Sequence, residues 1–227
     1  MAAAFVVLLL MPESIFRERR TAETIETSLS THGVIKLIAK DQYLLLTVVA
    51  LALTDPLFDG VRSFEPIFME ELGLPVSVIG LAATLSALLE VPMMLGADGL
   101  IHRFGVQRIV MFVLTFDLIR RLLVWFVPNG WVVFGLNILT AVSFTLRLVS
   151  TVHLVNLRMP KQYTTTAVTF IFNTLNGVMY MVSNAISGVV YDTYGARQIY
   201  LVSATLCVIA LGCALAARHV SSEKELV

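Results

Sequence analysis

The stretch Leu72–Met94, LGLPVSVIGLAATLSALLEVPMM, decides the fold of this protein. It carries a single charged residue, Glu90, and most of its other side chains are apolar. A hydrocarbon core about 30 Å thick is crossed by roughly 20 apolar residues in a helix. The stretch is long enough for this, so it predicts a membrane-spanning helix over residues 76–97.

Similar apolar windows recur on both sides of this stretch. Of the 227 residues, 57% are hydrophobic and 14% are charged, and the mean hydropathy is +0.84. Soluble domains have about 25% charged residues, so the composition indicates an integral membrane protein. The expected fold class is all-α, a polytopic membrane protein whose six transmembrane helices form a bundle near residues 43–66, 76–97, 108–127, 131–155, 166–188 and 199–216.

The remaining segments flank this bundle, which we place at residues 43–217. Residues 1–11 are apolar but too short to cross a bilayer, so we interpret them as the tail of a preceding transmembrane helix. Residues 12–42 form a cytoplasmic linker. Within it, GVIKLIAK (33–40) predicts a helix on the membrane surface, with a plain solvated linker as the alternative. Residues 218–227 form a cytoplasmic tail.

The basic residues predict the orientation, because Lys and Arg in short loops accumulate on the cytoplasmic side. Outside the spans, only Arg197 falls on the opposite side, so both termini are expected in the cytoplasm. The net charge is zero and the basic residues follow the membrane side, so nothing indicates nucleic-acid binding. The basic residues on the predicted cytoplasmic side are Arg17, Arg19, Arg20, Lys36, Lys40, Arg103, Arg108, Arg158, Lys161, Arg218 and Lys224.

Ionisable residues inside the spans indicate a polar interior. A charge at the bilayer centre costs about 3 kcal/mol or more, so such residues face a bundle interior or a water-filled cavity. Asp55, Asp59 and Arg62 are four and three residues apart and share one helix face. Glu90 follows Ser86 by one turn. In the third span, Asp117 can pair with Arg120 or Arg121 at three or four residues' distance.

Two further spans carry polar stripes at helical spacing. Hydrogen bonding between packed helices explains one such stripe equally well. Several stripes together with the embedded charges favour a shared polar cavity. The stripe of the fourth span is Asn137, Thr140, Ser143, Arg147 and Thr151, and that of the fifth is Asn173, Asn176, Tyr180, Ser183, Asn184 and Ser187.

The embedded acids outnumber the embedded bases by one, five to four. The acids are Asp55, Asp59, Glu65, Glu90 and Asp117, and the bases are Arg62, Arg120, Arg121 and Arg147. A desolvated carboxylate without a cation beside it can take up a proton near neutral pH, and Asp55 or Glu90 is our candidate carrier. In the alternative, all of these charges are paired structurally, and the surplus disappears because we expect Glu65, next to Pro66, to reach the outer interface.

Two loop segments resemble signatures of the major facilitator superfamily. LGLPVSVIGLAATLSALLEVPMM followed by GLIHRFGVQR resembles that family's seventh-to-ninth helix region and its G-x-x-x-D-R-x-G-R-like loop. Asp98 and His102 replace the first glycine and the acidic residue of that signature. GVVYDTYGAR is similar to the related loop before the last helix. The signature residues that are kept are Arg103, Gly105 and Arg108 in the first loop, and Gly188, Asp192, Gly195 and Arg197 in the second.

Within that family, TDPLFDGVRSFEPIFMEELG is similar to the seventh helix of the lactose permease and nucleoside:proton symporter group. Arg120 resembles the ninth-helix arginine of the lactose permease. Thr140 and Ser143 stand where that permease has a histidine and its coupling glutamate, so its coupling machinery does not transfer whole. The resemblance implies the C-terminal half of a twelve-helix, alternating-access transporter whose N-terminal half is missing, with Asp117, Arg120 and Arg121 as an internal charge clamp.

The predicted function is therefore secondary active transport of a small polar solute, a sugar or a nucleoside, coupled to protons, in a bacterial inner membrane. The alternative is a non-transporting sensor or an inactive truncated half. An intramembrane enzyme is disfavoured because the sequence has no H-E-x-x-H or G-x-S-x-G motif and no Cys/His cluster. We expect no cofactor and no metal ion.

Overall fold

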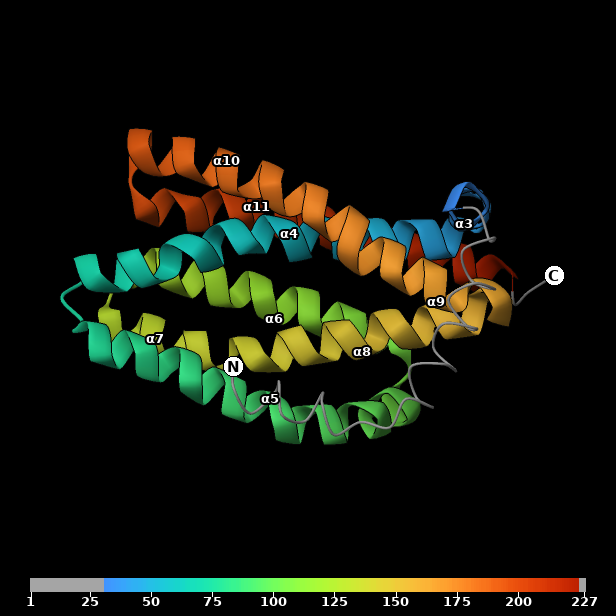
Figure 1. The fold of residues 1–227 in the computed structure, drawn as a ribbon, viewed down its shortest axis with the longest axis horizontal. Helices are drawn as coiled ribbons and strands as arrows, with labels where there is room; N and C mark the ends of the chain where they lie inside the picture. Colours follow the sequence, from blue (N-terminus) through green and yellow to red (C-terminus); the bar gives the residue numbers. More distant parts are fainter. Residues whose placement is uncertain (1–30, 225–227) are drawn as a thin grey trace, which may run out of the picture.

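The structure is a computed structural model that describes residues 31–224, with side chains described for residues 33–54 and 60–219. Its long helices run side by side along one axis (Figure 1). The helices are α3 (Thr31–Lys40), α4 (Gln42–Glu71), α5 (Val76–Phe104), α6 (Val106–Phe126), α7 (Gly130–Ile138), α8 (Thr140–Arg158), α9 (Lys161–Thr169), the π-helix η1 (Phe170–Leu175), α10 (Asn176–Tyr194) and α11 (Ala196–Lys224).

Three helical stretches among the described residues are long and apolar enough to cross a membrane, namely Val76–Phe104, Gly130–Arg158 and Ala196–His219. A fourth is reached if Gly33–Lys40 and Gln42–Thr54, which meet at 104°, count as one bent span. The all-α membrane bundle is thus confirmed. The other predicted spans lie in α4, α6 and the α9–α10 segment, and their crossing of the bilayer stays a prediction.

The linker segment GVIKLIAK is helical, as the pattern predicted. Val34 and Ile38 of α3 are buried in the core. Asp41 lies at the bend between α3 and α4 and caps the N-terminus of α4. The Asp41 carboxylate accepts hydrogen bonds from the backbone N–H groups of Tyr43 and Leu44. Such a cap satisfies donors that the first helical turn leaves unpaired.

Glycine turns join two of the helix pairs. Gly105 links α5 to α6 with φ +83°, and Gly195 links α10 to α11 with φ +85°, a region that disfavours side chains with a Cβ. Gly188, the other signature glycine, has only the Phe64 ring near its missing Cβ, at 3.9 Å, so it makes no close helix approach. Nearby, the Tyr191 hydroxyl donates a hydrogen bond to Glu71, which raises the pKa of Tyr191.

The hydrophobic core is divided along the bundle axis. On α6, Val110, Val113 and Leu114 belong to one apolar cluster, whereas Val124 belongs to a second cluster nearer the opposite end. The residues between them on the same buried face are Asp117, Arg120 and Arg121. The middle of the bundle is therefore polar.

Candidate functional site

The charges in the middle of the bundle gather into one group. We call Glu65, Asp117, Arg120, Arg121 and Arg147 the buried charge cluster. Each is at most 4% exposed. Glu65 comes from α4, Arg147 from α8 and the other three from α6, where spacings of three and four residues place them on one face. Buried charges of this kind are stable only when they are paired and hydrogen-bonded.

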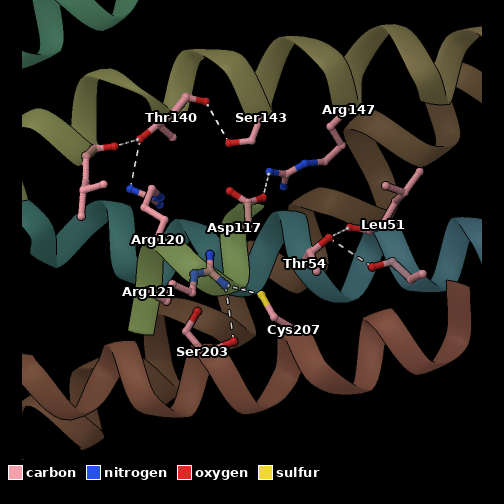
Figure 2. Close-up of polar contacts among 12 residues, drawn as sticks. Leu51, Thr54, Asp117, Arg120, Arg121, Thr140, Ser143, Arg147, Ser203 and Cys207 are labelled. Carbon is pink, nitrogen blue, oxygen red and sulfur yellow. Dashed lines mark hydrogen bonds and ion pairs between the residues drawn. The ribbon is translucent and has the colours of Figure 1, made fainter. Parts of the chain in front are cut away.

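Asp117 pairs across helices. Its Oδ2 accepts a hydrogen bond from Arg147 Nη2 of α8 at 3.0 Å (Figure 2). The spacing predicts a pair with Arg120 or Arg121, and the ion pair that the structure gives for Asp117 is with Arg147. Asp117 and Arg120 both bond to α8, whereas Arg121 bonds to α11.

The two arginines of α6 diverge accordingly. Figure 2 shows Arg120 turned toward Thr140 and Arg121 turned toward Ser203 and Cys207 of α11. Arg120 Nη1 donates to the Thr140 hydroxyl at 3.1 Å, and Arg121 Nη1 donates to the Ser203 carbonyl at 3.4 Å and lies 2.8 Å from Cys207 Sγ. The cluster thereby ties α6 to both neighbours.

Glu65 is buried, and its expected position at the outer rim is wrong. Its carboxylate lies 3.5 Å from Arg120 Nη1 and accepts hydrogen bonds from Asn137 Nδ2 at 2.9 Å and the Tyr200 hydroxyl at 3.3 Å. The sequence interpretation ended the span at Pro66. In the structure α4 continues to Glu71, which places Glu65 more than one turn inside the helix.

A cavity of about 410 Å³ opens beside this cluster. Polar groups from several helices converge on it, and two phenyl rings, Phe144 and Phe172, give it apolar faces. Such a combination is typical of small-molecule sites. Its lining residues are Arg62, Glu65, Pro66, Ala83, Ser86, Ala87, Glu90, Arg120, Asn137, Thr140, Phe144, Arg147, Leu148, Phe172 and Asn176.

Four of the predicted pathway residues line this cavity, namely Arg62, Glu90, Arg147 and Asn176. The Arg62 guanidinium carbon lies 5.9 Å from the centre of the Phe144 ring. Glu90 is half-buried on α5, and among the described residues it has no hydrogen-bond or ion-pair partner. The side chains of Asp55 and Asp59 lie outside the described residues.

Asn173 and Tyr180 do not line this cavity. Both are exposed. The fifth-span stripe divides instead, because Ser183 and Ser187 are buried against α4, where the Gly60 N–H donates to Ser183 Oγ at 3.1 Å. That part of the stripe bonds two helices together.

Two of the five residues of the fourth-span stripe donate hydrogen bonds within their own helix. The hydroxyl of Ser143 donates to the Thr140 carbonyl, and that of Thr151 donates to the Arg147 carbonyl. Asn137, Thr140 and Arg147 line the cavity and also bond to other side chains of the interior. The spacing of polar residues thus identified the interior face of the helix. It did not distinguish residues that hydrogen-bond within the bundle from residues that line the cavity.

The signature-loop residues lie at the ends of the bundle, away from the cavity. Arg103 and Arg108 are exposed beside the Gly105 turn, and Asp192 is exposed before the Gly195 turn. Arg197 Nε donates to the Trp125 carbonyl at 2.7 Å and its guanidinium stacks on that indole at 5.2 Å. These contacts join α11 to α6.

The sequence interpretation missed one group of potential metal ligands. Asp98, His102 and His153 lie together where α5 and α8 end, with His102 Nε2 3.5 Å from Asp98 Oδ2. The spacing of Asp98 and His102 shows that they share a face of α5. No signal in the sequence placed His153 beside them, because it belongs to another helix.

Comparisons with known proteins agree with this architecture. Residues 1–202 match the MFS_1 like family. A protein named maltose permease from Geobacillus stearothermophilus is 26% identical over 174 residues, which cover 77% of this chain and 44% of that protein. A Bacillus subtilis (strain 168) protein named uncharacterized transporter YwbF is 22% identical over 183 residues, covering 81% and 46%. The chain thus spans about half the length of these curated relatives.

Proposed function

The chain belongs to the MFS_1 like family, a family of the major facilitator superfamily, and from this premise we propose that it is one half of a secondary active transporter. The observation that carries the proposal is the cavity of about 410 Å³ beside the buried charge cluster. Polar groups from α4, α5, α7, α8 and α10 meet there at mid-bundle, which is where alternating-access transporters bind their solutes.

The lining favours a hydroxyl-rich solute. Arg62, Glu90 and Asn176 offer hydrogen-bonding groups, and Phe144 and Phe172 offer flat apolar faces. A sugar presents hydroxyl edges and C–H faces that fit both kinds of surface. A relative named maltose permease supports the same class. We therefore propose a sugar as the solute, with nucleosides as the competing class.

We propose that a second six-helix half, N-terminal in the whole protein, supplies the opposite wall. Only 6% of the apolar window of α5 is buried, against 39% in α11, so α5 has an uncovered face beside the cavity. In this arrangement residues 43–217 form the bundle of the C-terminal half, and the predicted segment of residues 1–11 lies outside the described residues. We place the protein in a bacterial inner membrane with both termini cytoplasmic.

We propose that Glu90 carries the coupling proton. It lies in the cavity without a cation partner among the described residues, whereas Glu65 and Asp117 each have an arginine. An unpaired intramembrane carboxylate that reaches water is suited to bind and release a proton. Asp55, whose side chain lies outside the described residues, stays the second candidate.

Solute counterflow tests the proposal. The protein is purified in the form that the cell makes and is reconstituted into liposomes loaded with maltose, other glucosides or nucleosides. We expect exchange of a sugar, reduced about tenfold or more by Arg62→Gln, because a charge-assisted hydrogen bond is worth roughly 1.5–3 kcal/mol. The control is Lys161→Gln, an exposed cation outside the cavity.

Three other outcomes would each change the account. Exchange of nucleosides alone would replace the sugar with the competing class. Equal losses in both variants would show that Arg62 has no role in solute binding. No exchange with any solute would contradict transport and favour the sensor or inactive-half alternative.

A further inference from the structure

Three metal-ligating side chains meet at the end of the bundle where α5 and α8 both terminate. Asp98 and His102 are one turn apart on α5, and His153 is on α8. The ring centres of His102 and His153 are 5.4 Å apart with planes at 87°. One ligand atom from each of the three side chains lies within 4.8 Å of the others. The side chains of Asp98 and His102 are about two-thirds exposed. The packing of α5 against α8 is therefore explained without a bound ion.

We propose that Asp98, His102 and His153 bind a divalent transition-metal ion of the zinc class. Two imidazole nitrogens and one carboxylate oxygen form a donor set that suits Zn²⁺ and does not suit Mg²⁺ or Ca²⁺, which take oxygen ligands. Three protein ligands leave one tetrahedral position for water.

The geometry is compatible with that ion. Bonds of about 2.1 Å in a tetrahedron hold neighbouring ligand atoms roughly 3.4 Å apart. His102 Nε2 and Asp98 Oδ2 are already 3.5 Å apart, and the third atom lies within 4.8 Å. The exposure of the two α5 side chains leaves them free to rotate and close the remaining gap.

The second signature segment of the chain provides an internal comparison. Its corresponding positions hold Gly188 and Asp192, which offer one carboxylate and no imidazole. In the first segment Asp98 and His102 stand at those positions, one turn apart. The two substitutions that depart from the signature are therefore the two that create ligands, and α8 adds the third.

A bound ion would fasten α5 to α8 at the predicted cytoplasmic end. Both helices line the cavity, through Glu90 on α5 and Arg147 on α8. The inference concerns metal binding alone and goes beyond the proposed transport, so either can fail without the other.

Metal titration of the tag-free, detergent-purified protein tests the site. After chelator treatment and its removal, Zn²⁺ is titrated calorimetrically and Co²⁺ by its visible absorption. We expect one ion per chain bound at the site. Asp98→Asn, His102→Gln and His153→Gln should each weaken binding about tenfold or more, since even partners outside the coordination shell contribute 10- to 100-fold. The control is His219→Gln, an exposed histidine on α11.

The elution volume from gel filtration establishes that each variant is folded. The α5 positions are exposed, so their substitution leaves the core intact. The proposal is overturned if wild type shows no saturable binding, if a folded Asp98→Asn or His102→Gln variant binds as tightly as wild type, or if His219→Gln loses as much affinity as they do.

Discussion

Glu65 and Glu90 line the same cavity but differ in their surroundings. Glu65 is 2% exposed and has Arg120, Asn137 and Tyr200 around its carboxylate. Glu90 is half-buried and has no such partner among the described residues. The comparison shows that intramembrane charge serves two purposes. Within the buried charge cluster it joins helices, whereas we propose that Glu90 on α5 serves a solute or a proton.

The largest effect is expected when a carboxylate is removed from the buried charge cluster, which tests whether these charges hold the helices together. Asp117→Ala should lower the free energy of unfolding by about 3–5 kcal/mol, because it deletes the buried acceptor of Arg147. Unfolding in detergent micelles, followed by circular dichroism against added denaturant, measures the change. Asp192→Ala removes an exposed carboxylate and should stay within about 0.5 kcal/mol.

A double variant sharpens this test. Replacing both partners by apolar residues, Asp117→Leu with Arg147→Met, should recover part of the loss, since a buried ion pair often matches a hydrophobic pair of similar volume. A difference of less than about 1 kcal/mol between Asp117→Ala and Asp192→Ala would contradict the structural role of the cluster.

The packed interface between α4 and α10 should give the next largest effect. A Cβ at Gly60 would lie 2.1 Å from Ser187 Oγ and 2.6 Å from Ser183 Oγ, so Gly60→Ala forces these helices apart. We expect a loss of about 1–3 kcal/mol in the same unfolding measurement. Gly188→Ala is the matched control, because only the Phe64 ring approaches its Cβ position. Equal losses at both glycines would contradict the described packing.

The bend between α3 and α4 should give a smaller effect. Asp41 caps α4 and also lies 3.6 Å from Arg158 at the end of α8. Asp41→Ala should cost about 1 kcal/mol, whereas Asp41→Asn should cost less, because asparagine caps helices as well as aspartate does. Measured by denaturant unfolding, the cost of Asp41→Asn isolates the ion pair with Arg158, and the difference between the two variants isolates the cap. If Asn is as damaging as Ala, the ion pair dominates and the cap contributes little.

The sequence allowed the helices and their polar faces to be predicted. Apolar windows located each long helix, and the spacing of Asp117, Arg120 and Arg121 identified one buried face of α6. Gly105 and Gly195, both kept signature residues, lie at tight turns in the structure, because positive φ angles favour residues without a Cβ.

The partners across helices could not be predicted. Pairing of Asp117 with Arg147, or of Glu65 with Arg120, depends on how each helix is rotated about its axis, and one sequence does not fix that rotation. Glu65 was misplaced because Pro66 was taken as a helix end, although α4 continues beyond it. The position of His153 beside Asp98 and His102 could not be predicted either, because it also depends on contact between distant segments of the chain.

Glu90 gives the most direct test of the account, because its substitution should leave stability almost unchanged and abolish coupling. The measurement is solute-driven proton uptake into liposomes that contain wild type or Glu90→Gln, with unfolding followed in parallel. We predict that Glu90→Gln loses proton uptake while its free energy of unfolding changes by less than about 0.5 kcal/mol. Undiminished proton uptake in a folded Glu90→Gln protein would contradict the proposal that Glu90 on α5 carries the coupling proton.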